Sequence, residues 1–322
     1  MHEPDGEYVP MDEGRVHPDL RAELAARPPF RLEEAIALLR SEGVSAAATA
    51  DPRLIVEDRL APGPAGAPPV AVRLYVPAGP SRRRPAVLWV HGGGYVLGSA
   101  LTEDPFATAL CLAADVVVAS VDYRLAPENP FPAGLEDVYA ALAWLADEAP
   151  VGLDRDHLGV AGMSAGGGLA AAVALLARDR GGPSLVFQMP LCPMLDDANA
   201  TPSSREFRDP RVWNRAANRA AWAMYLGPLQ GGGAAVPAYA APARADDLAR
   251  LPPAYIAVGA LDPFRDEDIA YARRLAEAGV PTELHVFPGC FHGFEAVPLA
   301  DVATRARSEY VGALRRGLRG QG

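Results

Sequence analysis

The chain has 322 residues, half of them hydrophobic, and a formal net charge of −10. This length allows one large hydrophobic core, so we expect a single catalytic domain with a smaller accessory region. The acidic balance argues against a nucleic-acid partner, because a polyanion is repelled by a negatively charged surface.

The first predicted element is a helix near the N-terminus. Two prolines at 28–29 open segment 30–43, in which apolar residues recur at helical spacing before a glycine. Residues 53–60 and 70–76 have the composition of strands, with a loop rich in Pro, Gly and Ala between them.

From residue 85 onward, apolar runs alternate with segments of helical period. Runs of Val, Ile and Leu without polar alternation are typical of strands buried on both faces. The pattern predicts an α/β fold with a mostly parallel sheet covered by helices on both sides. The apolar runs are 85–94, 116–123, 157–164, 184–192, 254–262 and 283–289, and the helical segments are 134–148, 165–180 and 265–279.

Segment 199–235 interrupts this alternation and is rich in Arg, Asn, Trp and Gly. We therefore predict N-terminal cap helices in residues 1–50 and a catalytic domain in residues 51–322, with a cap insertion at about 199–235. In open parallel sheets, ligands bind beyond the carboxyl ends of the strands. Residues that follow the apolar runs are accordingly the candidates for chemistry.

The N-terminal segment, the lengths of the apolar runs and the cysteine spacing indicate where the protein is located and which bound groups it lacks. The N-terminal 15 residues are polar and acidic, which does not match a secretory signal, and no apolar run is long enough for a membrane span. We expect a cytoplasmic protein. Cys111, Cys192 and Cys290 lack the spacing of a disulfide framework or a zinc site, so we expect them to be buried, with Cys290 close enough to His292 to line the site.

A serine lies directly between a predicted strand and a predicted helix, in the sequence Gly162-Met163-Ser164-Ala165-Gly166. A sharp turn of this kind needs small residues two positions either side and places the hydroxyl at a helix N-terminus. There the free N–H groups and the helix dipole favour negative charge. Ser164 is therefore the candidate nucleophile.

A glycine-rich segment, His91-Gly92-Gly93-Gly94, follows the strand run at 85–90. Glycines allow backbone N–H groups to approach a ligand closely, which an oxyanion hole requires. We assign its donors as the N–H groups of Gly92, Gly93 and Ala165.

The base must be a histidine, and of the six we choose the one that lies in a loop beyond the last predicted strand, at the correct edge of the sheet. His292 lies just beyond the run at 283–289 and is our candidate. His285 is inside that run, and His157 begins a strand at its opposite end. The remaining histidines are His2 and His17 in the polar N-terminal segment and His91 in the glycine-rich segment.

The acid that orients the base should fall between Ser164 and His292 in chain order. Asp262 directly follows the apolar run at 254–261. Asp266, Glu267 and Asp268 lie at a predicted helix start, where acidic residues are common for capping. Asp262 completes a predicted Ser-His-Asp triad.

Several motifs in order resemble those of the hormone-sensitive-lipase-like esterases, the bacterial family IV group of α/β-hydrolases. The resemblance covers about residues 70 to 295. One departure is Met163, where members often carry Asp or Thr. The matching segments are HGGGY at 91–95, DYRLAPE at 122–128, FPAGLEDVYAAL at 131–142, GMSAGG at 162–167, LDPFRDED at 261–268 and FHGF at 291–294.

The resemblance implies an α/β-hydrolase fold with a small helical cap and hydrolysis of short-chain carboxylic esters through an acyl-enzyme. It implies a small-molecule ester as substrate, no metal or organic cofactor, no membrane partner and a tendency to form homodimers through the sheet edge. Tyr123 and Glu128 match a motif that supports the site, and we interpret them as parts of a buried structural network.

Three alternative functions use the same fold. One is a peptidase or thioesterase, for which the sequence offers no distinguishing feature. An amide or formamide hydrolase would use the same nucleophile and base, and only the pocket would distinguish it. A non-catalytic small-molecule receptor, as in the plant gibberellin receptor, lacks the catalytic histidine, whereas His292 is present here. Leu97, Phe207, Trp213, Trp222, Met224 and Phe264 are candidates for apolar pocket walls.

Overall fold

The computed structural model describes residues 8–42, 51–79, 83–147, 152–230 and 236–320. Within these ranges, eight strands form one sheet in the order β1-β2-β4-β3-β5-β6-β7-β8. Strand β2 is antiparallel to both of its neighbours, and every adjacent pair from β4 to β8 is parallel. The prediction of a mostly parallel sheet is confirmed.

The strands agree closely with the predicted apolar runs. Their bounds are β1 (Leu54–Ala61), β2 (Val70–Pro77), β3 (Arg84–Val90), β4 (Val117–Asp122), β5 (Leu153–Met163), β6 (Phe187–Leu191), β7 (Ala254–Leu261) and β8 (Thr282–Phe291). Strand β6 is buried throughout, and β3, β4 and β7 are buried except for one residue each. These central strands are covered on both faces, which explains why their sequences lack polar alternation.

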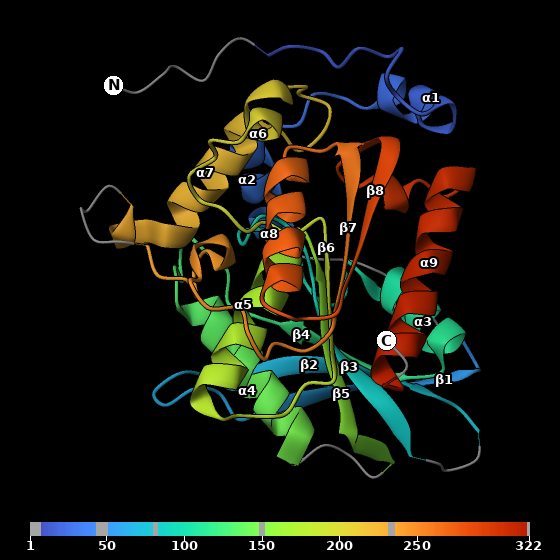
Figure 1. Cartoon of the computed structure of the whole chain (residues 1–322), viewed down its shortest axis with the longest axis vertical. Coiled ribbons are helices and arrows are strands. Elements are labelled where there is room, and N and C mark those ends of the chain that lie inside the picture. The colour runs from blue at the N-terminus through green and yellow to red at the C-terminus, as the bar shows by residue number, and fades with distance from the viewer. Residues whose placement is uncertain (1–7, 43–50, 80–82, 148–151, 231–235, 321–322) are drawn as a thin grey trace.

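Helices cover both faces of the sheet (Figure 1). Helices α3 and α9 pack together on one face, and α4, α5 and α8 cover the other. The bounds are α1 (Pro18–Ala26), α2 (Leu32–Glu42), α3 (Asp104–Ala114), α4 (Ala133–Asp147), α5 (Ala165–Arg180), α6 (Pro202–Glu206), α7 (Arg215–Leu226), α8 (Arg265–Glu277) and α9 (Asp301–Leu318), with short 3₁₀ turns at Gly227–Leu229, Pro242–Arg244 and Phe294–Ala296.

The segments predicted to form a cap lie near one another in space. Helix α2 contacts α7, although about 180 residues separate them in sequence. Figure 1 shows α6 and α7 at the end of the molecule where β7 and β8 end. Helix α2 begins with buried Leu32, as the apolar period predicts. Gly43, the predicted end of that helix, and residues 231–235 of the predicted insertion lie outside the described residues.

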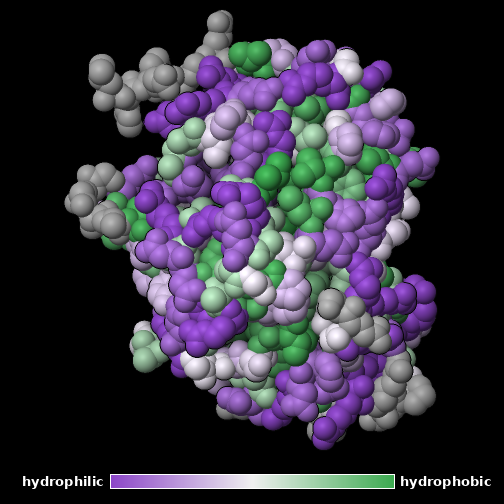
Figure 2. Space-filling view, viewed as in Figure 1, coloured by the Kyte–Doolittle hydropathy of each residue, from purple (hydrophilic) through white to green (hydrophobic). Residues whose placement is uncertain are grey.

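The surface carries isolated apolar side chains among polar ones. Figure 2 shows hydrophilic residues over most of one face, with hydrophobic patches between them. Leu284 on the edge strand β8 and Ile269 on α8 are among the large hydrophobic residues that are exposed. A homodimer through this edge stays a prediction. Among the described helices, none combines the length and apolarity needed to cross a bilayer.

Candidate active site

Ser164 lies on the sharp turn between β5 and α5. Its backbone has a φ of 57° and a ψ of −120°, a left-handed conformation that strains a residue with a side chain. The glycines two positions either side, Gly162 and Gly166, are required because any side chain there would collide with the backbone. A Cβ atom at Gly162 would lie 2.4 Å from the Gly166 carbonyl oxygen, and one at Gly166 would lie 2.1 Å from the Val90 carbonyl oxygen. The strand-turn-helix geometry predicted for Ser164 is therefore present.

The three predicted side chains meet beyond the carboxyl ends of β5, β7 and β8. His292 Nε2 lies 3.0 Å from Ser164 Oγ, and His292 Nδ1 lies 2.7 Å from Asp262 Oδ2. Asp262 accepts a second hydrogen bond, from the Phe264 N–H, at 2.9 Å. Because Nδ1 faces a carboxylate, it carries a proton, which leaves Nε2 of the neutral ring free to accept the serine proton.

Burial and charge act on His292 in opposite directions. Asp262 is 1% exposed and the His292 side chain is 11% exposed. Burial alone would lower the pKa of His292, but the charge of Asp262 and its hydrogen bond outweigh this and raise that pKa above its ordinary value. The Asp262 carboxylate thus stabilises the imidazolium that forms when His292 takes a proton.

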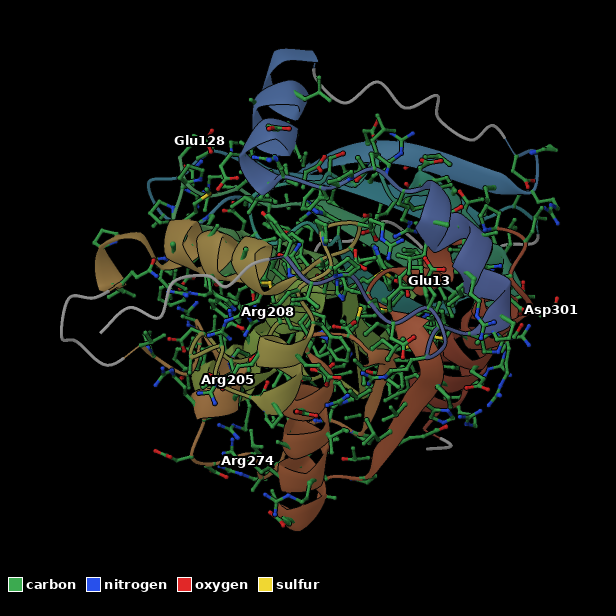
Figure 3. All side chains as sticks on the ribbon, turned by 90° about the horizontal axis from the view of Figure 1, so that it is seen from above. Glu13, Glu128, Arg205, Arg208, Arg274 and Asp301 are labelled. Carbon is green, nitrogen blue, oxygen red and sulfur yellow. The ribbon has the colours of Figure 1, made fainter. Side chains whose placement is uncertain are left out.

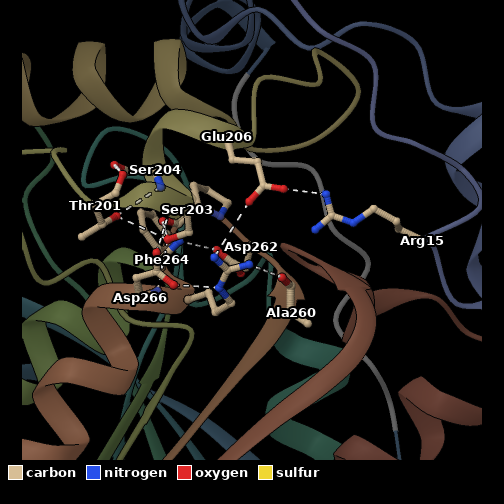
Figure 4. Close-up of polar contacts among 11 residues, drawn as sticks. Arg15, Thr201, Ser203, Ser204, Glu206, Ala260, Asp262, Phe264 and Asp266 are labelled. Carbon is tan, nitrogen blue, oxygen red and sulfur yellow. Dashed lines mark hydrogen bonds and ion pairs between the residues drawn. The ribbon is translucent and has the colours of Figure 1, made fainter.

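The loop that carries Asp262 is held by hydrogen bonds from α6 (Figure 4). The buried Ser203 hydroxyl donates to the Pro263 carbonyl at 2.9 Å, and the Asp266 carboxylate accepts the Ser203 N–H at 2.7 Å. Glu206 of the same helix pairs with Arg15 at 2.5 Å, which connects the N-terminal segment to this network. The position of the acid therefore depends on the mid-chain insertion as well as on β7.

The hydrogen bonds of the glycine-rich loop argue against one predicted oxyanion donor, the Gly92 N–H. The Gly92 N–H donates to Glu103 Oε1 at 2.9 Å, so it is already engaged and does not fit the role of a free oxyanion donor. Among the described residues, the N–H groups of Gly93, Gly94 and Ala165 have no hydrogen-bond acceptor. The sequence pattern could not assign the individual N–H groups of this loop, since their directions depend on peptide orientation.

His91 supports the loop from within. Its Nδ1 lies 2.8 Å from the Gly92 carbonyl, and its ring stacks on Tyr123 at 4.3 Å between centroids. The Tyr123 hydroxyl donates to the His91 carbonyl at 3.0 Å, as expected of a supporting residue. The predicted buried network involving Glu128 is wrong, because Glu128 is exposed (Figure 3) and Arg124 pairs with Asp137 instead.

All three cysteines are buried, as predicted. The cysteine nearest the triad is Cys192, which directly follows β6 and has a φ of 36°. Potential ligand atoms of Cys192, Asp262 and His292 lie within 4.8 Å of one another. However, Asp262 and His292 are hydrogen bonded at 2.7 Å, and burial raises the pKa of the Cys192 thiol well above its usual range. This set therefore fits a hydrogen-bonded pair better than a metal site.

The other histidines have separate structural partners. His285 lies 2.8 Å from Glu283 and 2.9 Å from Glu309, and His157 lies 2.9 Å from Asp154. His17 lies 3.6 Å from Asp19. His2 lies outside the described residues. His292 is thus the histidine that meets Ser164 in the part of the chain that the structure describes.

Two of the candidate wall residues are close to His292. The Phe264 ring lies edge-on to it at 5.0 Å, and the Trp213 ring lies 6.3 Å away. Trp222 instead packs in the core against Tyr95. Phe207 is buried near the Arg15 and Arg265 guanidinium groups.

Comparison with known proteins places this geometry in a family. The model of a family described as having an alpha/beta hydrolase fold matches residues 87–296. The chain belongs to this family. The predicted resemblance to hormone-sensitive-lipase-like α/β-hydrolases is confirmed. The matched range contains the Ser164, Asp262 and His292 positions together with the glycine-rich loop.

Curated relatives of this α/β-hydrolase are similar over most of its length. It is 42% identical over 273 residues to Esterase LipI of Mycobacterium tuberculosis, covering 84% of each chain. It is 40% identical over 270 residues to Carboxylesterase NlhH of the same species, covering 83% of this chain and 84% of the relative.

Among solved structures, one titled Bacterial Heroin Esterase superposes with a TM-score of 0.88 at 39% identity, covering 95% of this chain and 99% of the other. Esterase LipW from Mycobacterium marinum superposes with a TM-score of 0.80 at 36% identity, covering 96% and 98%. The eight-stranded sheet and its flanking helices are therefore those of an α/β-hydrolase.

Proposed function

We propose that the chain hydrolyses short-chain carboxylic esters, with Ser164 as nucleophile, His292 as base and Asp262 as the acid that orients the base. The class is that of its relatives: the chain is a carboxylesterase. The single observation that supports the mechanism best is the continuous set of contacts from Ser164 Oγ through His292 to Asp262, at 3.0 and 2.7 Å.

In acylation, His292 Nε2 takes the Ser164 proton while Oγ attacks the ester carbonyl carbon. The carbonyl oxygen becomes negatively charged, and the N–H groups of Gly93, Gly94 and Ala165 are the donors available to it. Collapse of this intermediate breaks the bond to the alcohol oxygen, which receives the proton from His292. Water then attacks the acyl-enzyme by the same route and releases the acid.

The preference for short acyl chains is proposed from the surroundings of the loop. The edge of the Trp213 ring would lie 2.3 Å from a Cβ atom at Gly94, so this ring packs directly on the glycine-rich loop. Together with Phe264 it encloses His292. We propose that α1, α2, α6 and α7 form the cap that carries this wall. A non-catalytic receptor is not favoured, because His292 is within hydrogen-bond distance of Ser164.

The test compares wild type with Ser164→Ala on p-nitrophenyl esters from acetate to laurate. We expect hydrolysis to be fastest for short esters, and we expect kcat to fall about 10⁴-fold or more in the variant. Ser308→Ala is the matched control, since this exposed serine on α9 bonds only the Thr304 carbonyl among described residues and should keep full activity. Wild-type rates in Ser164→Ala would refute the assignment. Activity on anilides or formamides but on no ester of the series would favour an amide hydrolase.

A further inference from the structure

Glu103 departs from the usual chemistry of a helix start. It is the residue that precedes α3, a position where Ser, Thr, Asp or Asn normally caps the helix. Its side chain makes no capping hydrogen bond. Asp104, the next residue, anchors the start of α3 to β2 by accepting hydrogen bonds from Tyr75 at 2.9 Å and Arg73 at 3.1 Å. The helix start is thus fixed without help from the Glu103 side chain, although the Glu103 carbonyl accepts the Ala107 N–H at 2.9 Å.

The Glu103 carboxylate turns toward the glycine-rich loop instead. Its Oε1 accepts the Gly92 N–H at 2.9 Å, and its Oε2 accepts the Trp89 indole N–H at 2.6 Å. Both partners are donors only, so each carboxylate oxygen is matched to one of them. Trp89 lies at the end of β3, two residues before the loop begins. The carboxylate therefore connects the last part of β3 to the first peptide of the loop.

The peptides on either side of Gly92 are both held by side chains. Glu103 accepts its N–H, and His91 Nδ1 donates to its carbonyl at 2.8 Å. Because a trans peptide is planar, a fixed Gly92 carbonyl directs the Gly93 N–H to the opposite side. Gly92 is also next to the nucleophile, since a Cβ atom there would lie 3.5 Å from Ser164 Cβ. A shift of this peptide would move the loop relative to Ser164.

We propose that Glu103 is a positioning residue that orients the oxyanion loop through the Gly92 N–H. This inference rests on the proposed ester hydrolysis and goes beyond it by assigning a residue outside the triad and outside the glycine-rich motif. Glu103 touches no reacting atom. Its contribution is to fix the direction in which the following N–H groups point before substrate binds.

The charges around Glu103 also support a positioning role. Among described residues, no arginine or histidine forms an ion pair with Glu103, and Glu295 lies close enough to repel it. Burial raises the pKa of Glu103 to about 7, against the two hydrogen bonds that lower it. A buried carboxylate without a cationic partner is unfavourable for folding, so its two hydrogen-bond donors are the feature that explains its presence.

The test uses a Trp89→Phe background, because glutamine at 103 would otherwise place an amide NH₂ against the indole N–H. Phenylalanine keeps the ring that packs on Phe106 and removes this donor. In that background, Glu103→Gln retains an acceptor for the Gly92 N–H, whereas Glu103→Ala retains none. We expect Glu103→Gln to keep a kcat close to its parent on p-nitrophenyl acetate. We expect kcat to fall about tenfold or more in Glu103→Ala, up to the roughly 100- to 1000-fold loss that is typical when an oxyanion donor is removed, with little change in KM.

A second readout separates positioning from general loosening of the fold. In trifluoroacetophenone, the ketone carbon is attacked by Ser164 Oγ, whose proton passes to His292, and the ketone oxygen becomes negatively charged in the oxyanion hole. Its inhibition constant should therefore rise by the factor by which kcat/KM falls. Thr102→Ala, which removes exposed hydrogen bonds to Ser99 in the same loop, is the control and should change neither value. Equal kcat values for Glu103→Gln, Glu103→Ala and their parent would overturn the inference while leaving the proposed function intact. A wild type without esterase activity and without ketone binding would overturn both.

Discussion

At the scale of single residues, the site depends on opposed effects acting on one imidazole. Burial destabilises a charged His292, and the Asp262 carboxylate stabilises it more strongly. A base with a raised pKa is protonated, and therefore inactive, up to a higher pH than an ordinary histidine. This gives the site a defined pH dependence.

We expect kcat/KM to fall as pH decreases through the raised pKa of His292, with a midpoint above the ordinary histidine value of about 6.5. A pH profile with p-nitrophenyl acetate measures this. His285→Gln, which lies within β8 and pairs with two glutamates, should leave the profile unchanged. The pKa of Glu103 is also raised, so the same profile is measured in Trp89→Phe with and without Glu103→Gln, and a midpoint that both variants share belongs to His292. A wild-type midpoint at or below pH 6.5 would contradict the expected effect of Asp262.

At the scale of elements, the turn between β5 and α5 is the most constrained part of the site. Ser164 holds a strained backbone, and the α5 helix packs so closely on β3 that Gly166 contacts the Val90 carbonyl. The strain persists because the surrounding structure fixes both ends of the turn. The glycines of the motif therefore serve helix-sheet packing as well as the exposure of the serine.

Gly166→Ala should destabilise the fold by at least about 1–3 kcal/mol, because the new methyl group would overlap the Val90 carbonyl, which is backbone and cannot move aside. Urea unfolding measures the free-energy change. Gly312→Ala in α9 is the control, since its Cβ would meet no atom closer than 3.4 Å. A helical glycine replaced without overlap should gain up to about 1 kcal/mol. Equal stability of the two variants would contradict the close packing of α5 on β3.

At the scale of the whole molecule, we expect one buried carboxyl group, that of Asp268, to make stability depend on pH. Asp268 is fully buried, and neither of its carboxylate oxygens has a hydrogen-bond partner among described residues. Burial raises the pKa of Asp268 well above its usual range. The folded state therefore binds the proton of the Asp268 carboxyl group more tightly than the unfolded state does. The free energy of unfolding then declines as pH rises from about 4, the pKa of this group in the unfolded chain, toward its raised pKa in the folded state.

Asp268→Asn should remove this decline, so the stability difference between variant and wild type should grow with pH, by at most about 1.4 kcal/mol per pH unit within that window. Urea unfolding at several pH values measures it. Asp246→Asn, at an exposed position, should stay within about 0.5 kcal/mol of wild type throughout. A difference for Asp268→Asn that shrinks as pH rises would have the wrong sign and would rule out the raised pKa.

The sequence alone determined the sheet, its flanking helices and the three residues that meet at its edge. Ser164, Asp262 and His292 each lie at or just beyond the end of an apolar run, and parallel strands buried on both faces bring such positions to one edge of the sheet. The pattern is readable because burial of a central strand leaves a continuous apolar signature in local sequence.

Only the tertiary structure decided the contacts between segments that share no local pattern. It assigned the Gly92 N–H to Glu103, placed Cys192 rather than Cys290 nearest the triad, and exposed Glu128. These outcomes depend on peptide orientation and on which side chains meet across elements, and no periodicity encodes either. The composition of a buried strand is enough to predict it, whereas a hydrogen bond between two loops depends on where the rest of the chain has placed them.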